Sequence, residues 1–135
     1  MPSPQIFMET EQVNFKKESL LVLKSYIQKE KRLCRGTFGS INNTKCALGC
    51  LMFGDPTIKD PYLLLINLGF AFADKLLTPE GRAVLFANDK VTYPNYETDK
   101  VTYPNYETEF DRKIRMLSWI DDQIKLIDFG QDQTI

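Results

Sequence analysis

Apolar residues recur at helical spacing near both ends of the chain. The first series lies within residues 14–33 and consists of Phe15, Leu20, Val22, Leu23, Tyr26 and Ile27. The second lies within residues 109–129 and consists of Phe110, Ile114, Leu117, Ile120, Ile124 and Ile127. Steps of three and four residues bring side chains onto one face of an α-helix. The pattern therefore predicts two amphipathic helices that each bury one stripe.

Two further apolar stretches lie between these helices. "CALGCLMFG" (46–54) is short and begins with small residues, so it predicts a short helix that another element approaches closely. "YLLLINLGFAFADKLL" (62–77) is apolar nearly all round, which predicts a helix at the centre of the fold or against a partner. Asp55 and Asp60 are each followed by proline, and this pair of residues predicts a helix start.

Threonine marks two more predicted helix starts. Thr78 is followed by proline and glutamate, and the residues after it predict a short helix or turn that ends near Asp89. Thr108 has Asp111 three residues later, which resembles a capping box with Asp in place of Glu. The last helix is therefore expected to begin directly after Thr108.

The ten residues "DKVTYPNYET" occur twice in succession, at 89–98 and 99–108. Val, Thr and Tyr favour strands, so the two "KVTY" copies predict a small β-hairpin. A ten-residue period that occurs only twice is too short for a solenoid. We therefore expect a lengthened loop at 89–108, since doubling the length of a loop costs only about 0.6 kcal/mol.

Helices with short, capped connections predict a mainly α fold, a compact orthogonal bundle of about four to five helices. The 135 residues match one domain. The expected organisation is a flexible N-terminal arm at 1–13, a single helical domain at 14–129 and a polar tail at 130–135. No apolar run reaches the ~18 residues that span a bilayer, and the N-terminus lacks the pattern of a secretory signal. We expect a cytoplasmic protein that does not enter a membrane.

The chain contains no histidine and only three cysteines. The absence of histidine excludes Ser-His-Asp and Cys-His mechanisms and every His-ligated metal site. Cys34, Cys46 and Cys50 lack the fourth ligand that structural zinc requires, and their odd number fits a reducing compartment. We expect no catalytic residues, no cofactor and no metal.

Cys46 leaves two interpretations open. It lies near a predicted helix N-terminus, where a lowered pKa would favour the thiolate and allow a small enzyme with Cys46 as its nucleophile. Alternatively, Cys46 and Cys50 face the core together, as small buried side chains.

Positive charge is concentrated in the first part of the chain. Residues 1–59 hold nine Lys/Arg against five Asp/Glu, whereas residues 60–135 hold eight against thirteen. A basic patch lies at the end of the first predicted helix and consists of Lys29, Lys31, Arg32 and Arg35. These cations either bind nucleic acid or complement the negative end of the helix dipole. Because the chain has no overall basic excess, nucleic-acid binding is the alternative and not the expectation.

Four of the six tyrosines lie in the duplicated segment, at Tyr93, Tyr96, Tyr103 and Tyr106. They alternate with proline and asparagine. Exposed tyrosine provides a large contact area at low entropic cost, so these side chains are the candidate binding residues. The alternative is that the tyrosines of one copy cover the helical core while those of the other face solvent.

Three short motifs stand in order along the chain: "LCRG" (Leu33–Gly36), "CALGC" (Cys46–Cys50) and "FAND" (Phe86–Asp89). In this order they resemble the Trp-x-x-Gly, Cys-Ala-Leu-Gly-Ala and Trp-Asn-Asp motifs of a family of small bacterial and phage proteins of unknown function. Leu33 replaces the tryptophan of the first motif, Cys50 the second alanine, and Phe86-Ala87 the aromatic residue before Asn-Asp.

The resemblance covers about residues 20–127. It implies a compact α-rich fold with a structural motif at Gly36, Cys46, Gly49, Asn88 and Asp89. In this motif, the resemblance implies that Cys46 caps a buried helix and that Asn88 and Asp89 form hydrogen bonds to a neighbouring loop or helix end.

These observations favour a non-catalytic protein that binds another protein and acts as an accessory or regulatory factor. By analogy with phage proteins, one concrete form is an inhibitor of a host enzyme. The alternatives are a small enzyme or ligand binder that uses Cys46 or the Asn88-Asp89 pair, and a nucleic-acid binder that uses the basic patch. The partner is not identified, and both a monomer and a homodimer stay open.

Overall fold

A computed structural model describes residues 13–35, 44–89 and 107–133 of the chain. These residues form five helices: α2 (Lys17–Gln28), α3 (Ala47–Phe53), α4 (Leu63–Asn67), α5 (Pro79–Asp89) and α6 (Glu109–Gln133). A two-stranded antiparallel sheet of β1 (Ala71–Ala73) and β2 (Leu76–Leu77) follows α4. The mainly α fold predicted from the sequence is confirmed.

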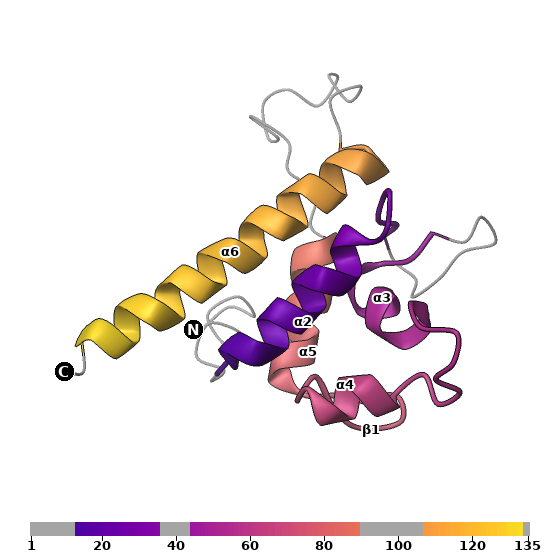
Figure 1. The fold of residues 1–135 in the computed structure, drawn as a ribbon, viewed down its shortest axis with the longest axis horizontal. Coiled ribbons are helices and arrows are strands. Elements are labelled where there is room, and N and C mark those ends of the chain that lie inside the picture. The colour runs from indigo at the N-terminus through magenta and orange to yellow at the C-terminus, as the bar shows by residue number, and fades with distance from the viewer. Residues whose placement is uncertain (1–12, 36–43, 90–106, 134–135) are drawn as a thin grey trace, which may run out of the picture.

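Helix α6 is the longest element and runs across the molecule beside α2 (Figure 1). Two ion pairs lie between these antiparallel helices: Lys17 Nζ lies 3.0 Å from Asp128 Oδ1, and Lys24 Nζ lies 2.8 Å from Asp121 Oδ1. Near the N-terminus of α2, the ring of Phe15 packs edge-on against Trp119 at 5.7 Å. The first and last helices are therefore held together over most of the length of α2.

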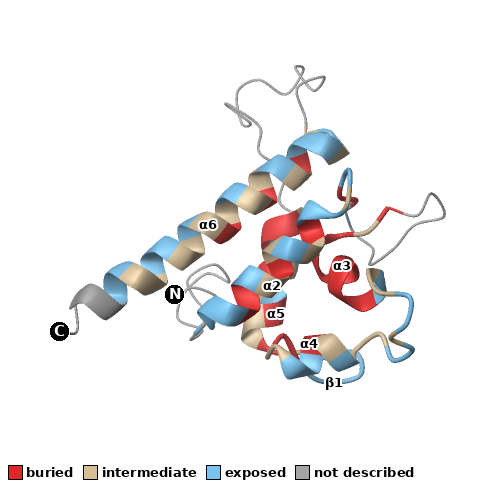
Figure 2. Cartoon of the chain, viewed as in Figure 1, coloured by how far each residue is buried: buried red, intermediate tan, exposed pale blue. Residues whose placement is uncertain are grey.

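The core lies between α2, α3, α5 and α6 (Figure 2), where the red, buried positions gather. Helix α3 is almost entirely buried, because its small residues allow the other helices to approach it on several sides. The largest fully buried side chains include Leu20, Leu23, Ile27, Leu48, Phe70, Met116 and Ile120.

The predicted long helix at 62–77 is wrong. Helix α4 stops at Asn67, and Gly69 then adopts a left-handed conformation with φ of 84°. The Phe70 N–H donates to the Leu65 carbonyl at 2.8 Å, and the Gly69 N–H donates to the Ile66 carbonyl at 3.1 Å. This pattern is a Schellman C-cap, which satisfies the last helix carbonyls and turns the chain. The residues after it form the hairpin instead of further helix.

Helix starts agree with the caps that the sequence predicted at two of four positions. Thr78 Oγ1 accepts from the Gly81 N–H at 3.1 Å, and Thr108 Oγ1 accepts from the Asp111 N–H at 3.0 Å. Asp60 accepts from the Tyr62 N–H, but α4 begins only at Leu63. Asp55 forms a local turn with Thr57 and starts no helix, so that prediction is wrong.

The predicted stripe of the last helix is confirmed from Leu117 onward, since Ile120 is in the core and Leu117, Ile124 and Ile127 pack against it, but its first two members are wrong. The structure buries Arg112, Met116 and Ile120, whereas Phe110 and Ile114 are 58% and 50% exposed. Helix α6 continues to Gln133, beyond the predicted start of a polar tail at residue 130. The predicted hairpin of the duplicated segment, residues 1–12 of the predicted arm at 1–13, and the last two residues of the chain lie outside the described residues.

Candidate functional site

Cys46 is the N-cap residue of α3. Its Sγ accepts a hydrogen bond from the Gly49 N–H at 3.3 Å, and its side chain is fully buried. The first turn of a helix leaves backbone N–H groups without partners inside the helix, and a cap satisfies one of them. Sulfur is a weak acceptor, so the cap by itself leaves the buried start of α3 incompletely satisfied.

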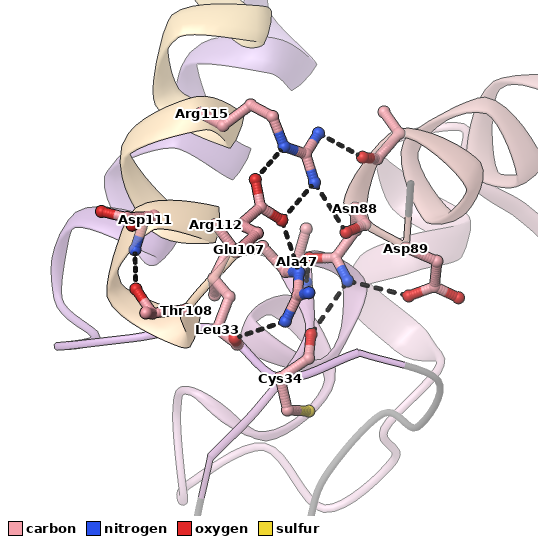
Figure 3. Close-up of polar contacts among 11 residues, drawn as sticks. Leu33, Cys34, Ala47, Asn88, Asp89, Glu107, Thr108, Asp111, Arg112 and Arg115 are labelled. Carbon is pink, nitrogen blue, oxygen red and sulfur yellow. Dashed lines mark hydrogen bonds and ion pairs between the residues drawn. The ribbon is translucent and has the colours of Figure 1, made fainter. Parts of the chain in front are cut away.

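Asn88 supplies a second acceptor at the same helix start. From the last turn of α5, its Oδ1 accepts from the Ala47 N–H at 3.0 Å, and its Nδ2 donates to the Cys34 carbonyl and to Asp89 Oδ1, each at 3.0 Å (Figure 3). The side chain is fully buried. One amide therefore joins α5 to the start of α3 and to the segment after α2.

Arg115 connects the same end of α5 to the chain before α6. Its Nη1 donates to the Ala87 carbonyl at 2.6 Å, and its Nη2 donates to both the Asn88 carbonyl and Glu107 Oε1 at 3.0 Å. Its Nε also bonds to the second oxygen of Glu107 (Figure 3). Carbonyls at a helix C-terminus attract cations, so Arg115 completes the end of α5.

Arg112 completes the network. It is 5% exposed, its Nη1 donates to the Leu33 carbonyl at 3.3 Å, and its Nε lies 3.1 Å from Glu107 Oε1 as an ion pair without hydrogen-bond geometry. We call Asn88, Glu107, Arg112 and Arg115 the clasp. It joins four segments that are distant in the sequence, and each of its charges has an opposite partner, as buried charges require.

The buried thiols are poorly suited to nucleophilic chemistry. Desolvation raises the pKa of Cys46 to about 12, and the hydrogen bond from Gly49 only partly opposes this rise. Burial also raises the pKa of Cys34 and of Cys50. The prediction that a helix N-terminus lowers the pKa of Cys46 is therefore wrong, because loss of water outweighs the helix. Cys46 and Cys50 are both part of the core.

The four cations of the basic patch are all exposed, but they differ in the residues that they contact. Lys29 lies over the ring of Tyr26, with Nζ 4.5 Å from its centroid, and Arg32 lies 3.5 Å from Glu109. Lys31 and Arg35 are exposed without an ion pair to any residue of the described ranges. Nearby acidic residues thus offset part of the positive charge that the sequence concentrates here.

Two groups of apolar side chains are exposed; the first lies in the stretch 62–77, which the sequence placed at the centre of the fold or against a partner, and the second was not predicted. On the hairpin, Phe72 is 63% and Leu76 is 55% exposed, beside Leu63 and Ile66 of α4. At the start of α6, Phe110 and Ile114 are exposed. The sequence carried one signal for the second group: Arg112 precedes Met116 and Ile120 by four and eight residues and so shares their buried face.

Several predicted site residues cannot be placed. Tyr93, Tyr96, Tyr103, Tyr106 and Gly36 lie outside the described residues. Of the structural motif, the structure brings Cys46, Gly49 and Asn88 together at the start of α3, and Asp89 adjoins them through Asn88.

Within the described ranges, no group of three or more Cys, Asp or Glu side chains is arranged to hold a metal ion. No helix in that part of the chain combines the length and apolar character needed to cross a membrane. Comparisons with protein-family models, with curated proteins and with solved structures found no match to this chain. The resemblance to the family of small bacterial and phage proteins therefore stays a prediction.

Proposed function

We propose that this chain acts by binding another protein, as an accessory or regulatory factor in the cytoplasm. The observation that carries the proposal is the apolar surface formed by Leu63, Ile66, Phe72 and Leu76, which we call the hairpin surface. These side chains are exposed on two elements that contact each other, and large exposed apolar surface is typical of interaction sites.

The hairpin surface follows from the way the chain leaves α4. Ala71 of β1 pairs with Leu77 of β2, and both side chains face the interior of the protein. Ala71 is 3% exposed and Leu77 is half-buried. Successive residues of a strand face opposite sides, so Phe72 is directed outward. Phe70, which precedes the strand, is buried, whereas Phe72 is 63% exposed.

The competing functions have less support. A nucleophile is expected to be accessible and readily ionised, and Cys46 is neither. Asn88 donates and accepts hydrogen bonds within the fold, which leaves it little capacity to hold a ligand. A role as an inhibitor of a host enzyme is the most specific form of the proposal, and it rests on the family resemblance alone.

The test compares the proteins that three forms of the full chain capture: the wild type and two double variants. The double variant Phe72→Ser/Leu76→Ser removes the hairpin surface, and Leu126→Ser/Phe129→Ser is the matched control, since Leu126 and Phe129 are similarly exposed at 63% and 61%. A specific partner should be lost only from the hairpin variant. Identical partner lists for all three forms would refute the hairpin surface.

A fourth form, with Tyr93, Tyr96, Tyr103 and Tyr106 changed to serine, tests the tyrosines separately. Loss of the same partner would extend the interface to the duplicated segment. Retention would exclude the tyrosines from it.

A further inference from the structure

The segment after α2 and the segment before α3 run side by side for a short distance. Leu33 and Lys45 form an isolated parallel β-bridge, and the Cys34 N–H donates to the Lys45 carbonyl at 3.0 Å. One residue further along both segments, Cys34 stands beside Cys46, whose backbone is still extended, at φ of −80° and ψ of 179°. Residues in register on parallel strands direct their side chains to the same side. The pairing therefore brings two cysteines together.

Asn88 holds the two segments at this spacing. Its amide donates to the Cys34 carbonyl and accepts from the N–H of Ala47, the residue after Cys46, each at 3.0 Å (Figure 3). Paired strands lie about 4.8 Å apart, and a disulfide joins residues whose Cα atoms are about 4.4–6.8 Å apart. Cysteines in this register thus meet the backbone requirement of a disulfide.

The two thiols also lie near each other. Cys34 Sγ is 3.8 Å from the carbonyl oxygen of Thr44, two residues before Cys46, so this thiol packs against the segment that carries the other. Desolvation is the main cause of the raised pKa of Cys46, and the Cys34 thiol is a further cause, which requires the two groups to be close. Both side chains belong to the buried core, and both are free thiols in the structure.

We propose that Cys34 and Cys46 form a reversible disulfide and make the stability of the fold depend on redox conditions. The oxidant is a low-molecular-weight disulfide such as oxidised glutathione. The Cys34 thiolate, the more exposed of the two at 4% against 0%, attacks one sulfur of the oxidant, and a glutathione thiolate leaves. The Cys46 thiolate then attacks the Cys34 sulfur of the mixed disulfide and releases the second glutathione. The two protons of the pair pass to the two glutathione thiolates, and the oxidant takes up two electrons.

Burial of both thiols limits this exchange to folding and to local opening of the paired segments. In a reducing compartment the pair persists as thiols, and more oxidising conditions convert it to the disulfide. The disulfide ties the start of α3 to the segment after α2, which are the two segments that Asn88 joins. It should stabilise the fold, because it restricts the unfolded chain. The site is independent of the hairpin surface.

The test refolds the full-length protein from urea in mixtures of reduced and oxidised glutathione, blocks the remaining thiols and maps the disulfide in tryptic peptides. The wild type should keep one free thiol, with residues 33–35 linked to residues 46–59, and Cys50→Ala should keep none. The same mixtures in urea are the control, because the unfolded chain favours the shorter loop between Cys46 and Cys50. Folding should raise the equilibrium constant for the Cys34–Cys46 disulfide about a hundredfold over its value in urea.

Cys34→Ala is the matched variant, since it lacks the pair and keeps Cys46 and Cys50. It should retain both thiols in mixtures that oxidise the wild type. The oxidised form of Cys50→Ala should melt about 10 °C above its own reduced form, a comparison within one sequence. Three free thiols in the refolded wild type at a glutathione ratio that oxidises the unfolded chain, an equal yield of disulfide in Cys34→Ala, or a lower melting temperature after oxidation would each overturn the proposal.

Discussion

Asn88→Ala is the substitution that most directly tests how the fold is held together. The amide bridges the Ala47 N–H and the Cys34 carbonyl, and both groups are buried. Alanine removes the bridge and leaves both backbone groups without this partner. The expected result is a large loss of stability from a single polar side chain.

The magnitude follows from the two orphaned groups. Leaving one buried donor or acceptor unsatisfied costs about 1–3 kcal/mol, so two groups at about 1.5 kcal/mol each give about 3 kcal/mol. Domains of this size have free energies of unfolding of about 5–15 kcal/mol. The loss is therefore a large fraction of the total, and it should lower the melting temperature by about 10 °C.

Urea unfolding followed by the fluorescence of Trp119, the only tryptophan, measures this loss. The ring packs against Phe15 between α2 and α6, so its emission reports on the core. The slope of the transition should stay unchanged while the midpoint falls. Asn67→Ala is the matched control, because Asn67 is exposed on α4 and should cost less than about 0.5 kcal/mol.

Asn88→Asp provides a second comparison. The carboxylate keeps an acceptor for the Ala47 N–H, but it sets a second oxygen against the Cys34 carbonyl and Asp89. At neutral pH it should be at least as destabilising as alanine. A loss below about 1 kcal/mol for both variants would refute the bridging role.

Three further predictions concern the loop, a glycine and the thiols. Removing residues 89–98 should change the free energy of unfolding by less than about 1 kcal/mol, because Asp99 then follows Asn88 and the identical second copy takes the place of the first. A broad, non-cooperative urea transition would contradict this prediction. Gly81→Ala should cost about 3 kcal/mol in the same titration, since an added Cβ would lie 2.0 Å from the Phe70 carbonyl oxygen, and wild-type stability would show that the backbone adjusts freely. Stability should fall above pH 9 by about 1.4 kcal/mol per pH unit for the Cys46 thiol, because the unfolded chain releases that proton near pH 9 whereas the folded chain retains it up to a pKa of about 12. Cys46→Ala should decline less steeply with pH, and equal slopes would refute the assignment.

Local chemistry made several elements predictable from the sequence. The stripe of α2 and the caps at Thr78 and Thr108 depend on residues within one or two turns, and the structure contains each of them. The start of α3 at Cys46 also depends on nearby residues, because the Cys46 side chain accepts from the Gly49 N–H three residues later. These features need no knowledge of the tertiary fold.

The errors arise where a tertiary contact decides between two local options. Gly69 could continue an apolar helix or terminate it, and the Thr78 hydroxyl, which donates to the Gly69 carbonyl at 2.7 Å, supports the terminated form. Burial of Arg112 requires Glu107 and the Leu33 carbonyl, and the latter is 79 positions away in the sequence. Periodicity alone assigns an arginine to the surface, so it extended the buried stripe of α6 to Phe110 and Ile114, which are exposed.

The clasp gives a physical reason to expect that the fold tolerates a change in the length of the segment at 89–108. Arg115 Nη2 donates both to the Asn88 carbonyl and to Glu107, so one guanidinium joins the two ends of the segment. These contacts do not depend on how many residues lie between Asp89 and Glu107. The length of the segment and the strength of the clasp should therefore act independently on stability.

A double-mutant cycle tests that independence. Arg115→Ala should cost about 2–4 kcal/mol, because it removes a part-buried ion pair and leaves helix carbonyls unsatisfied. Its cost should be the same within about 0.5 kcal/mol in the full chain and in the chain that lacks residues 89–98. A coupling energy above about 1 kcal/mol would show that the duplicated copy itself contributes to the clasp, and the duplication would then be part of what stabilises the fold.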